Sequence, residues 1–279
     1  MRIVNTEKIE NAVYNLALKA GIAVTPSCRA ALCSACGRER NPAAKFALET
    51  ILDNGDIALK EGMPVCQDTG MAVVILEIGQ AVRLEGKLLS DAVNCGVRRA
   101  YKDGYFRNSV CDPITRKNTG DNTPAVIHTE IVGGDKINIT FMPKGFGSEN
   151  MSRIYMLKPA QGVEGIISSI VNAVELAGSR PCPPVIVGVG IGGTFDNCTY
   201  IAKKALTRDI GTHNPRKEIE QIEMLALERI NTLKIGCQGF HGDITALAVH
   251  CECVPTHIAG LPVAVNIQCH CARCEKVEI

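Results

Sequence analysis

Residues 180–193, Arg-Pro-Cys-Pro-Pro-Val-Ile-Val-Gly-Val-Gly-Ile-Gly-Gly, decide the fold class. The apolar, β-branched segment from Val185 to Val189 is bounded by proline and glycine, which is typical of a central strand covered on both faces. Residues 263–267 have the same character and predict a second such strand. Cys182 directly precedes the first strand, where neighbouring prolines would fix the direction of its thiol.

The segments around these strands predict further helices and strands. Apolar side chains gather on one broad face of residues 162–177 and of residues 216–232, so both are expected to pack on a sheet as helices. Residues 27–41 are rich in small side chains and are expected to be irregular, with a possible domain boundary there. The other expected helices are 7–20, 42–54 and 89–101, and the other expected strands are 71–78 and 137–141.

Strands that alternate with amphipathic helices indicate an α/β protein. No internal repeat and no linker rich in Ser, Gly or Pro divides the sequence. We therefore expect a single mixed α/β domain over residues 1–279, in which a mainly helical N-terminal segment, residues 1–50, precedes sheets covered by helices.

Composition excludes several classes of protein. Apolar residues form 46% of the chain and charged residues 21%, as in an ordinary globular protein. The formal net charge is +1, so nucleic acid is not expected as a partner. No apolar stretch approaches the ~20 residues of a membrane span, and the N-terminus lacks the pattern of a signal peptide. We expect a cytoplasmic protein with no membrane span.

The chain contains 14 cysteines. A cytoplasmic protein of this size does not use them as a disulfide framework, so some are expected to bind metal. Cys66, Cys182 and Cys269 each flank a predicted strand at a loop position, where sites are commonly built. Three thiolates can hold an iron–sulfur cluster that leaves one iron open to substrate. Cys95 and Cys198 are expected to be small buried side chains.

Spacing leaves two alternatives open. One is a zinc-stabilised interaction module, and the other is a nicotinamide oxidoreductase, because Gly188-x-Gly190-x-x-Gly193 matches the dinucleotide fingerprint. The second lacks the expected acidic residue at the end of a strand about 20 positions later. The candidate zinc ligands are Cys33 with Cys36, and Cys251 and Cys253 with Cys269, Cys271 and Cys274.

Four separated motifs resemble class I fumarase. The similarity extends from about Ile51 to Arg273, and the chain ends where the α subunits of two-subunit class I fumarases and tartrate dehydratases end. His241 departs from the family, which usually has glycine there. The motifs are Cys66-Gln-Asp-Thr-Gly70, Lys144-Gly-Phe-Gly-Ser-Glu-Asn150, Cys182-Pro-Pro with Gly190-Ile-Gly-Gly-Thr-Phe-Asp196, and Pro255-Thr-His-Ile-Ala-Gly-Leu-Pro-Val-Ala-Val-Asn-Ile-Gln-Cys269.

The resemblance implies a [4Fe-4S] cluster with Cys66, Cys182 and Cys269 as ligands. It also implies a dicarboxylate site in which an arginine fork matches a carboxylate, a Gly-Ser backbone presents N–H groups to an anion, and a neutral histidine donates to a substrate oxygen. Asp68 and His257 are expected to be catalytic. The expected substrate-binding residues are Gln67, Asp68, Arg107, Gly147, Ser148 and His257.

The implied activity is the reversible hydration of fumarate to malate, a step of the tricarboxylic acid cycle, and the alternative is an α subunit of L-tartrate dehydratase. A separate β subunit would supply the general base and further carboxylate contacts, in an expected α2β2 assembly. An iron that is open to substrate is also open to oxidants, so oxygen sensitivity is expected.

Overall fold

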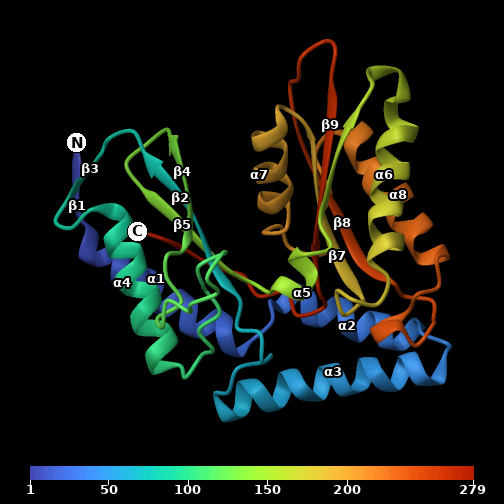
Figure 1. The fold of residues 1–279 in the computed structure, drawn as a ribbon, viewed down its shortest axis with the longest axis horizontal. Helices are drawn as coiled ribbons and strands as arrows, with labels where there is room; N and C mark the ends of the chain where they lie inside the picture. Colours follow the sequence, from blue (N-terminus) through green and yellow to red (C-terminus); the bar gives the residue numbers. More distant parts are fainter. The chain divides into compact units, whose positions relative to one another are not determined.

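The protein is a mixed α/β structure, described over residues 1–279 by a computed structural model (Figure 1). The predicted fold class is confirmed. The chain forms two compact units, each assembled from separated segments, so one catalytic domain over residues 1–279 stays a prediction. The first unit consists of Met1–Thr25, Asn54–Phe146 and Arg273–Ile279, and the second of Pro26–Asp53 and Gly147–Ala272.

The first unit is built on a four-stranded sheet with the order β10-β5-β2-β4. β2 is parallel to β4 and antiparallel to β5. α1 packs against α4 and β5, and β1 and β3 form a separate parallel pair. The bounds are β1 Arg2–Asn5, α1 Thr6–Ile22, β2 Met71–Gly79, β3 Val82–Glu85, α4 Leu89–Asp103, β4 Val126–Val132, β5 Ile137–Lys144 and β10 Glu275–Glu278.

The second unit is built on a sheet with the order β6-β9-β7-β8. β7 is parallel to β8 and antiparallel to β9. α6 and α8 cover one face of this sheet and α7 covers the other (Figure 1). The bounds are α2 Pro26–Arg38, α3 Pro42–Glu61, α5 Phe146–Glu149, β6 Arg153–Leu157, α6 Gly162–Ala177, β7 Val185–Gly192, α7 Phe195–Ala205, α8 Lys217–Thr232, β8 Ala246–Val254 and β9 Leu261–Gln268. Residues 54–61 of α3 and Phe146 of α5 belong to the first unit.

β7 is buried along its whole length, which confirms the predicted central strand. Gly188 and Gly190 lie inside this strand and face α7. A Cβ added to Gly190 would lie 2.1 Å from the carbonyl oxygen of Cys198, and one added to Gly188 would lie 2.2 Å from that of Ala202. These glycines therefore permit close packing of α7 on the strand. Their spacing does not form the turn of a dinucleotide site, and that alternative is not supported.

The segment 27–41, expected to be irregular, contains the regular helix α2, so that expectation is wrong. Cys28, Leu32 and Ala35 are buried at intervals of about one turn, but this stripe of mostly small side chains gives only a weak periodic signal. By length and composition alone, Thr6–Arg38 could also cross a membrane. In the structure this stretch is two helices separated by residues 23–25, and α1 contributes its buried face to a core.

Candidate functional site

The sheet of the second unit brings two predicted thiol ligands to one edge. Cys182 lies three residues before β7, and Cys269 directly follows β9. β7 and β9 are antiparallel neighbours with Ile186 opposite Gln268, so the beginning of β7 and the end of β9 meet. We call this edge, defined by Cys182 and Cys269, the thiol edge.

Hydrogen bonds join the two loops at the thiol edge. The backbone N–H of His270 donates to the carbonyl oxygen of Cys182 at 3.4 Å, and Nδ1 of His270 lies 3.0 Å from the same oxygen. The Gln238 side chain donates to the Pro183 carbonyl at 2.9 Å. The Cys28 thiol donates to the His270 carbonyl at 3.1 Å. Because burial raises the pKa of Cys28 to about 12, this thiol stays protonated and can donate.

The two thiols at this edge suit metal ligation. Cys182 is exposed and Cys269 is half-buried. The Cys182 backbone has a φ of 56°, a left-handed conformation that is uncommon outside glycine and often marks functional positions. By contrast, burial raises the pKa of Cys198 to about 11 and holds the pKa of Cys251 well above its usual range. Since iron–sulfur clusters require thiolate ligands, Cys182 and Cys269 fit such a cluster better than these buried thiols do.

Gly147 and Ser148 lie at the thiol edge as well. They belong to α5, which ends four residues before β6 begins. β6 is antiparallel to β9, with Arg153 opposite Val265, so the segment before β6 lies beside the end of β9. Gly147 is exposed, whereas Ser148 is buried.

In the first unit, the predicted residues Cys66, Gln67 and Asp68 form the loop before β2. The Asp68 carboxylate accepts the backbone N–H of Gly70 at 3.0 Å and that of Phe146 at 2.8 Å. The Asp68 carbonyl accepts Nη2 of Arg273 at 2.8 Å. The chain leaves the first unit after Phe146 and re-enters it at Arg273, so both crossing points are hydrogen-bonded to Asp68.

Polar contacts that the sequence did not reveal hold Arg107 beside this loop. The Thr69 hydroxyl donates to the Arg107 carbonyl at 2.9 Å. The buried Tyr101 hydroxyl donates to the carbonyl oxygens of Thr69 and Gly70, at 2.8 and 2.9 Å. The Asn122 amide donates to the same Gly70 oxygen at 3.1 Å. The structure thus brings Arg107 together with Gln67 and Asp68, and the guanidinium remains exposed.

Two buried cations, Lys144 and Arg273, lie in the same part of the first unit. Their exposed fractions are 1% and 2%. A Cβ added to Gly145 would lie 3.2 Å from Oδ2 of Asp68 and 3.9 Å from Nη2 of Arg273. Because Arg273 also donates to the Asp68 carbonyl, charged side chains gather around the Asp68 loop.

His257 lies at the opposite end of the second unit's sheet from the thiol edge, in the turn between β8 and β9. β9 separates the two positions by its length from Leu261 to Gln268, about 23 Å of extended chain. Nδ1 of His257 accepts the Ala259 N–H at 3.2 Å, which leaves the proton of a neutral ring on Nε2. The second unit therefore does not bring His257 together with Cys182, Cys269 and Gly147.

The strand register also separates the cysteines of the four-thiolate zinc alternative. Cys253 is level with Ile191 and Val263, six residues of strand, or about 20 Å, from the level of Cys269. Cys251 and Cys253 cannot share one ion with Cys269, so that alternative is wrong. Among the other cysteines, Cys198 is buried as predicted, Cys95 is only half-buried, and Cys33 and Cys36 lie one turn apart on α2.

Comparison with known proteins relates the chain to one family. A family model described as fumarate hydratase (fumerase) matches residues 10–278. A provisionally named L(+)-tartrate dehydratase subunit alpha of Methanocaldococcus jannaschii is 40% identical over 272 residues, which cover 95% of this chain and 95% of that protein. The L(+)-tartrate dehydratase subunit alpha of Escherichia coli strain K12 is 30% identical over 238 residues, or 84% of this chain and 78% of that protein.

Proposed function

The chain belongs to the fumarate hydratase (fumerase) family of hydro-lyases, and from this premise we propose that it is the α subunit of an iron–sulfur enzyme that interconverts fumarate and malate. The observation that carries the proposal is the thiol edge, where Cys182 and Cys269 lie beside the exposed Gly147. The proposed third ligand is Cys66, two residues before Asp68, whose carboxylate accepts the Phe146 N–H and whose carbonyl accepts the Arg273 guanidinium.

These three thiolates would hold a [4Fe-4S] cluster. When bound, such a cluster supplies a Lewis-acidic iron that polarises the C–O bond of the substrate. The chain's own residues bind and orient the diacid. The exposed Arg107 guanidinium offers a planar fork for one carboxylate, and the Gly147–Ser148 backbone offers N–H donors for the other.

Asp68 is the proposed catalytic group of this chain. Each of its carboxylate oxygens accepts one backbone N–H, which fixes the orientation of the carboxylate and leaves lone pairs that can accept the hydrogen of a substrate hydroxyl. Gln67, exposed on the same loop, can donate to the substrate. The proton on the adjacent carbon would leave to a base of a separate β subunit.

L-Tartrate is the second candidate substrate, because both relatives are named as L(+)-tartrate dehydratase α subunits. Dehydration of malate gives fumarate, whereas dehydration of tartrate gives a 2-oxo acid, so the products can be measured separately. For the anaerobic complex of this chain with its β subunit, kcat/KM for malate should exceed kcat/KM for tartrate at least about tenfold. A preference for tartrate would overturn the fumarase assignment and leave the hydro-lyase assignment intact.

We further propose a cytoplasmic α2β2 assembly whose activity is lost in air and restored by ferrous iron with a thiol. The names of the relatives as α subunits support a partner chain. The purified chain with a reconstituted cluster should turn over no substrate until the β subunit is added. Full turnover by the chain alone would contradict the requirement for a partner.

A further inference from the structure

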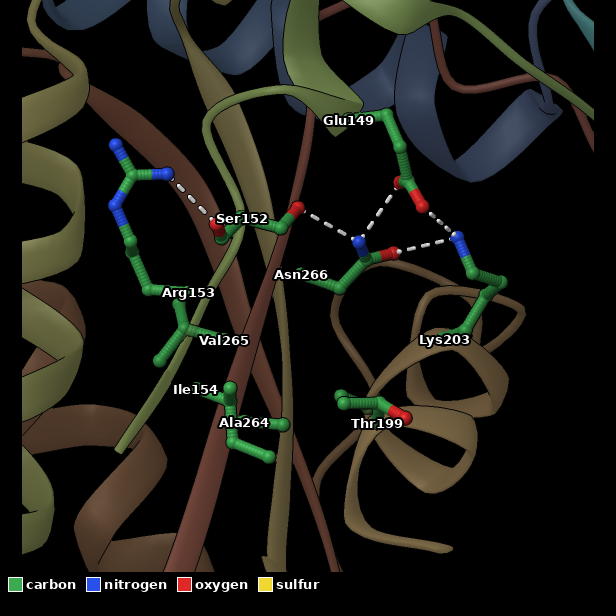
Figure 2. A pocket seen from close by; sticks show the side chains of 10 residues that line it. Glu149, Ser152, Arg153, Ile154, Thr199, Lys203, Ala264, Val265 and Asn266 are labelled. Carbon is green, nitrogen blue, oxygen red and sulfur yellow. Dashed lines mark hydrogen bonds and ion pairs between the residues drawn. The ribbon is translucent and has the colours of Figure 1, made fainter. Parts of the chain in front are cut away.

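A polar cluster of the second unit lies beside a cavity of about 200 Å³. Figure 2 shows Glu149, Ser152, Lys203 and Asn266 pointing toward one another at one end of this cavity, with Ile154 and Ala264 farther along it. We call these four residues the Lys203 cluster. They come from α5, the residue before β6, the last turn of α7 and the C-terminal part of β9.

Each polar group of the Lys203 cluster has a partner inside it. The Lys203 ammonium forms an ion pair with the Glu149 carboxylate and lies 3.5 Å from Oδ1 of Asn266. The Asn266 amide donates to Oε2 of Glu149 at 2.8 Å and to the Ser152 hydroxyl at 2.7 Å. The Ser152 hydroxyl also accepts the Ile267 N–H at 3.1 Å. The ion pair is largely shielded from water, since the Lys203 and Glu149 side chains are 16% and 25% exposed.

The cluster connects the two segments of the thiol edge. Glu149 directly follows Gly147 and Ser148, and Asn266 lies three residues before Cys269. Lys203 belongs to α7, and α7 packs on β7 and β9, so the sheet fixes the position of the helix that carries Lys203. We propose that Lys203 is a positioning residue, which fixes the Gly147–Ser148 backbone relative to Cys269 so that its N–H groups meet a substrate carboxylate. This inference rests on the proposed function and deepens it.

Lys203→Met keeps the approximate length of the side chain and removes its charge, which removes the ion pair between residue 203 and the Glu149 carboxylate. Lys203→Arg restores the charge, and the adjacent cavity leaves room for the larger guanidinium. The matched control is Arg208→Met, which breaks the ion pair with Glu223 in the same unit, where the side chains are 18% and 3% exposed. That pair contacts β8 rather than the thiol edge.

The first measurement is hydrogen exchange of the backbone amides of residues 147–152 in the anaerobic complex. Lys203→Met should raise their exchange rates about tenfold, while Lys203→Arg and Arg208→Met leave them near wild type. Unchanged exchange in Lys203→Met, or an equal rise in Arg208→Met, would overturn the inference. This measurement needs no substrate, so it stays decisive if the complex turns over neither malate nor tartrate and the proposed function fails.

The second measurement separates substrate binding from chemistry. Lys203→Met should raise KM for the diacid about tenfold and lower kcat by less than about threefold, because it loosens a binding contact. The visible absorption of the cluster per chain should not change, since no ligand thiol is altered. Lys203→Arg should restore KM. Loss of the cluster absorption, or a fall in kcat without a rise in KM, would overturn the positioning role.

Discussion

Residues with the same chemistry behave differently across the second unit according to where its sheet places them. The Cys182 thiol is exposed at a strand end, whereas the Cys251 thiol is buried within β8, and burial raises its pKa. His250, which precedes Cys251 in β8, is 1% exposed. Burial, with a smaller contribution from the Arg208 cation, lowers the pKa of His250 to about 4. The histidine is therefore neutral in the folded protein at neutral pH.

This burial predicts a loss of stability in acid. Unfolded histidine has a pKa of about 6.5, so between this value and the folded pKa of about 4 the unfolded state binds more protons. The contribution of His250 is complete above the unfolded pKa and falls with the pH by up to about 3 kcal/mol. Urea unfolding between pH 7.5 and pH 5 measures the slope of the free energy of unfolding against pH, and His250→Leu should make this slope smaller. Equal slopes for both proteins would contradict the prediction.

α7 packs closely on β7 because glycines of this strand have no Cβ atom. Gly190→Ala should destabilise the protein by about 3 kcal/mol, because the new Cβ would lie 2.1 Å from a backbone oxygen of α7. Gly37→Ala on α2 is the control, since nothing lies within 4 Å of the added Cβ. That helical substitution should stabilise the protein by roughly 0.5 kcal/mol. Denaturant midpoints compare the two variants, and equal midpoints would show that Gly190 does not serve packing.

The connection between α2 and α3 depends on one buried carboxylate. Glu39 is 5% exposed and accepts the backbone N–H groups of Arg40, Asn41, Asp243 and Ile244, at 2.9 to 3.2 Å. In Glu39→Gln, the side-chain NH2 group would face these backbone N–H groups and could not accept from them. The substitution should lower the free energy of unfolding by about 3 kcal/mol. The exposed Glu49→Gln on α3 should change it by less than about 0.5 kcal/mol. A similar effect of both substitutions would contradict this role.

Periodicity predicted the long elements of both units, including α1, α4, α6, α8 and the two central strands β7 and β9. It missed elements in which the buried side chains are small or polar, because such residues give little hydrophobic periodicity. In α2 the buried stripe consists of Cys28, Leu32 and Ala35. In β8, the polar His250 and Glu252 interrupt the apolar run, although His250 is buried. The short strands β1, β3 and β10 have four residues each, too few for a periodic signal.

At the scale of the whole molecule, the predicted site residues fall into groups that sequence spacing alone could not reveal. The pairing of β7 with β9 explains why Cys182 and Cys269 meet, although 87 positions separate them in the sequence, 269 less 182. The same pairing carries His257 to the other end of the sheet. The Lys203 cluster was not predicted, nor were the contacts of Tyr101 and Asn122 with the backbone of Thr69 and Gly70. Ordinary polar residues on helices and loops give no sequence signal until the fold brings them together.

Because the second unit holds His257 away from Cys182 and Cys269, we predict that in the proposed α2β2 assembly His257 acts at the site of a second copy of the chain. Cys269→Ser and His257→Asn should each abolish turnover when expressed alone. Co-expressed in equal amounts with the β subunit, they should recover roughly a quarter of wild-type activity, because half the pairs are mixed and each mixed pair has one intact site. No recovery, with mixed assemblies confirmed by mass, would contradict the exchange of His257 between copies.

The central claim is that Cys66, Cys182 and Cys269 share one cluster, and iron and sulfide analysis after anaerobic purification tests it most directly. The account predicts about four iron and four sulfide per wild-type chain. Cys66→Ser, Cys182→Ser and Cys269→Ser should each lose most of both, while the controls Cys33→Ser and Cys251→Ala retain them. Zinc in place of iron, or full iron and sulfide in any of the three ligand variants, would contradict the account.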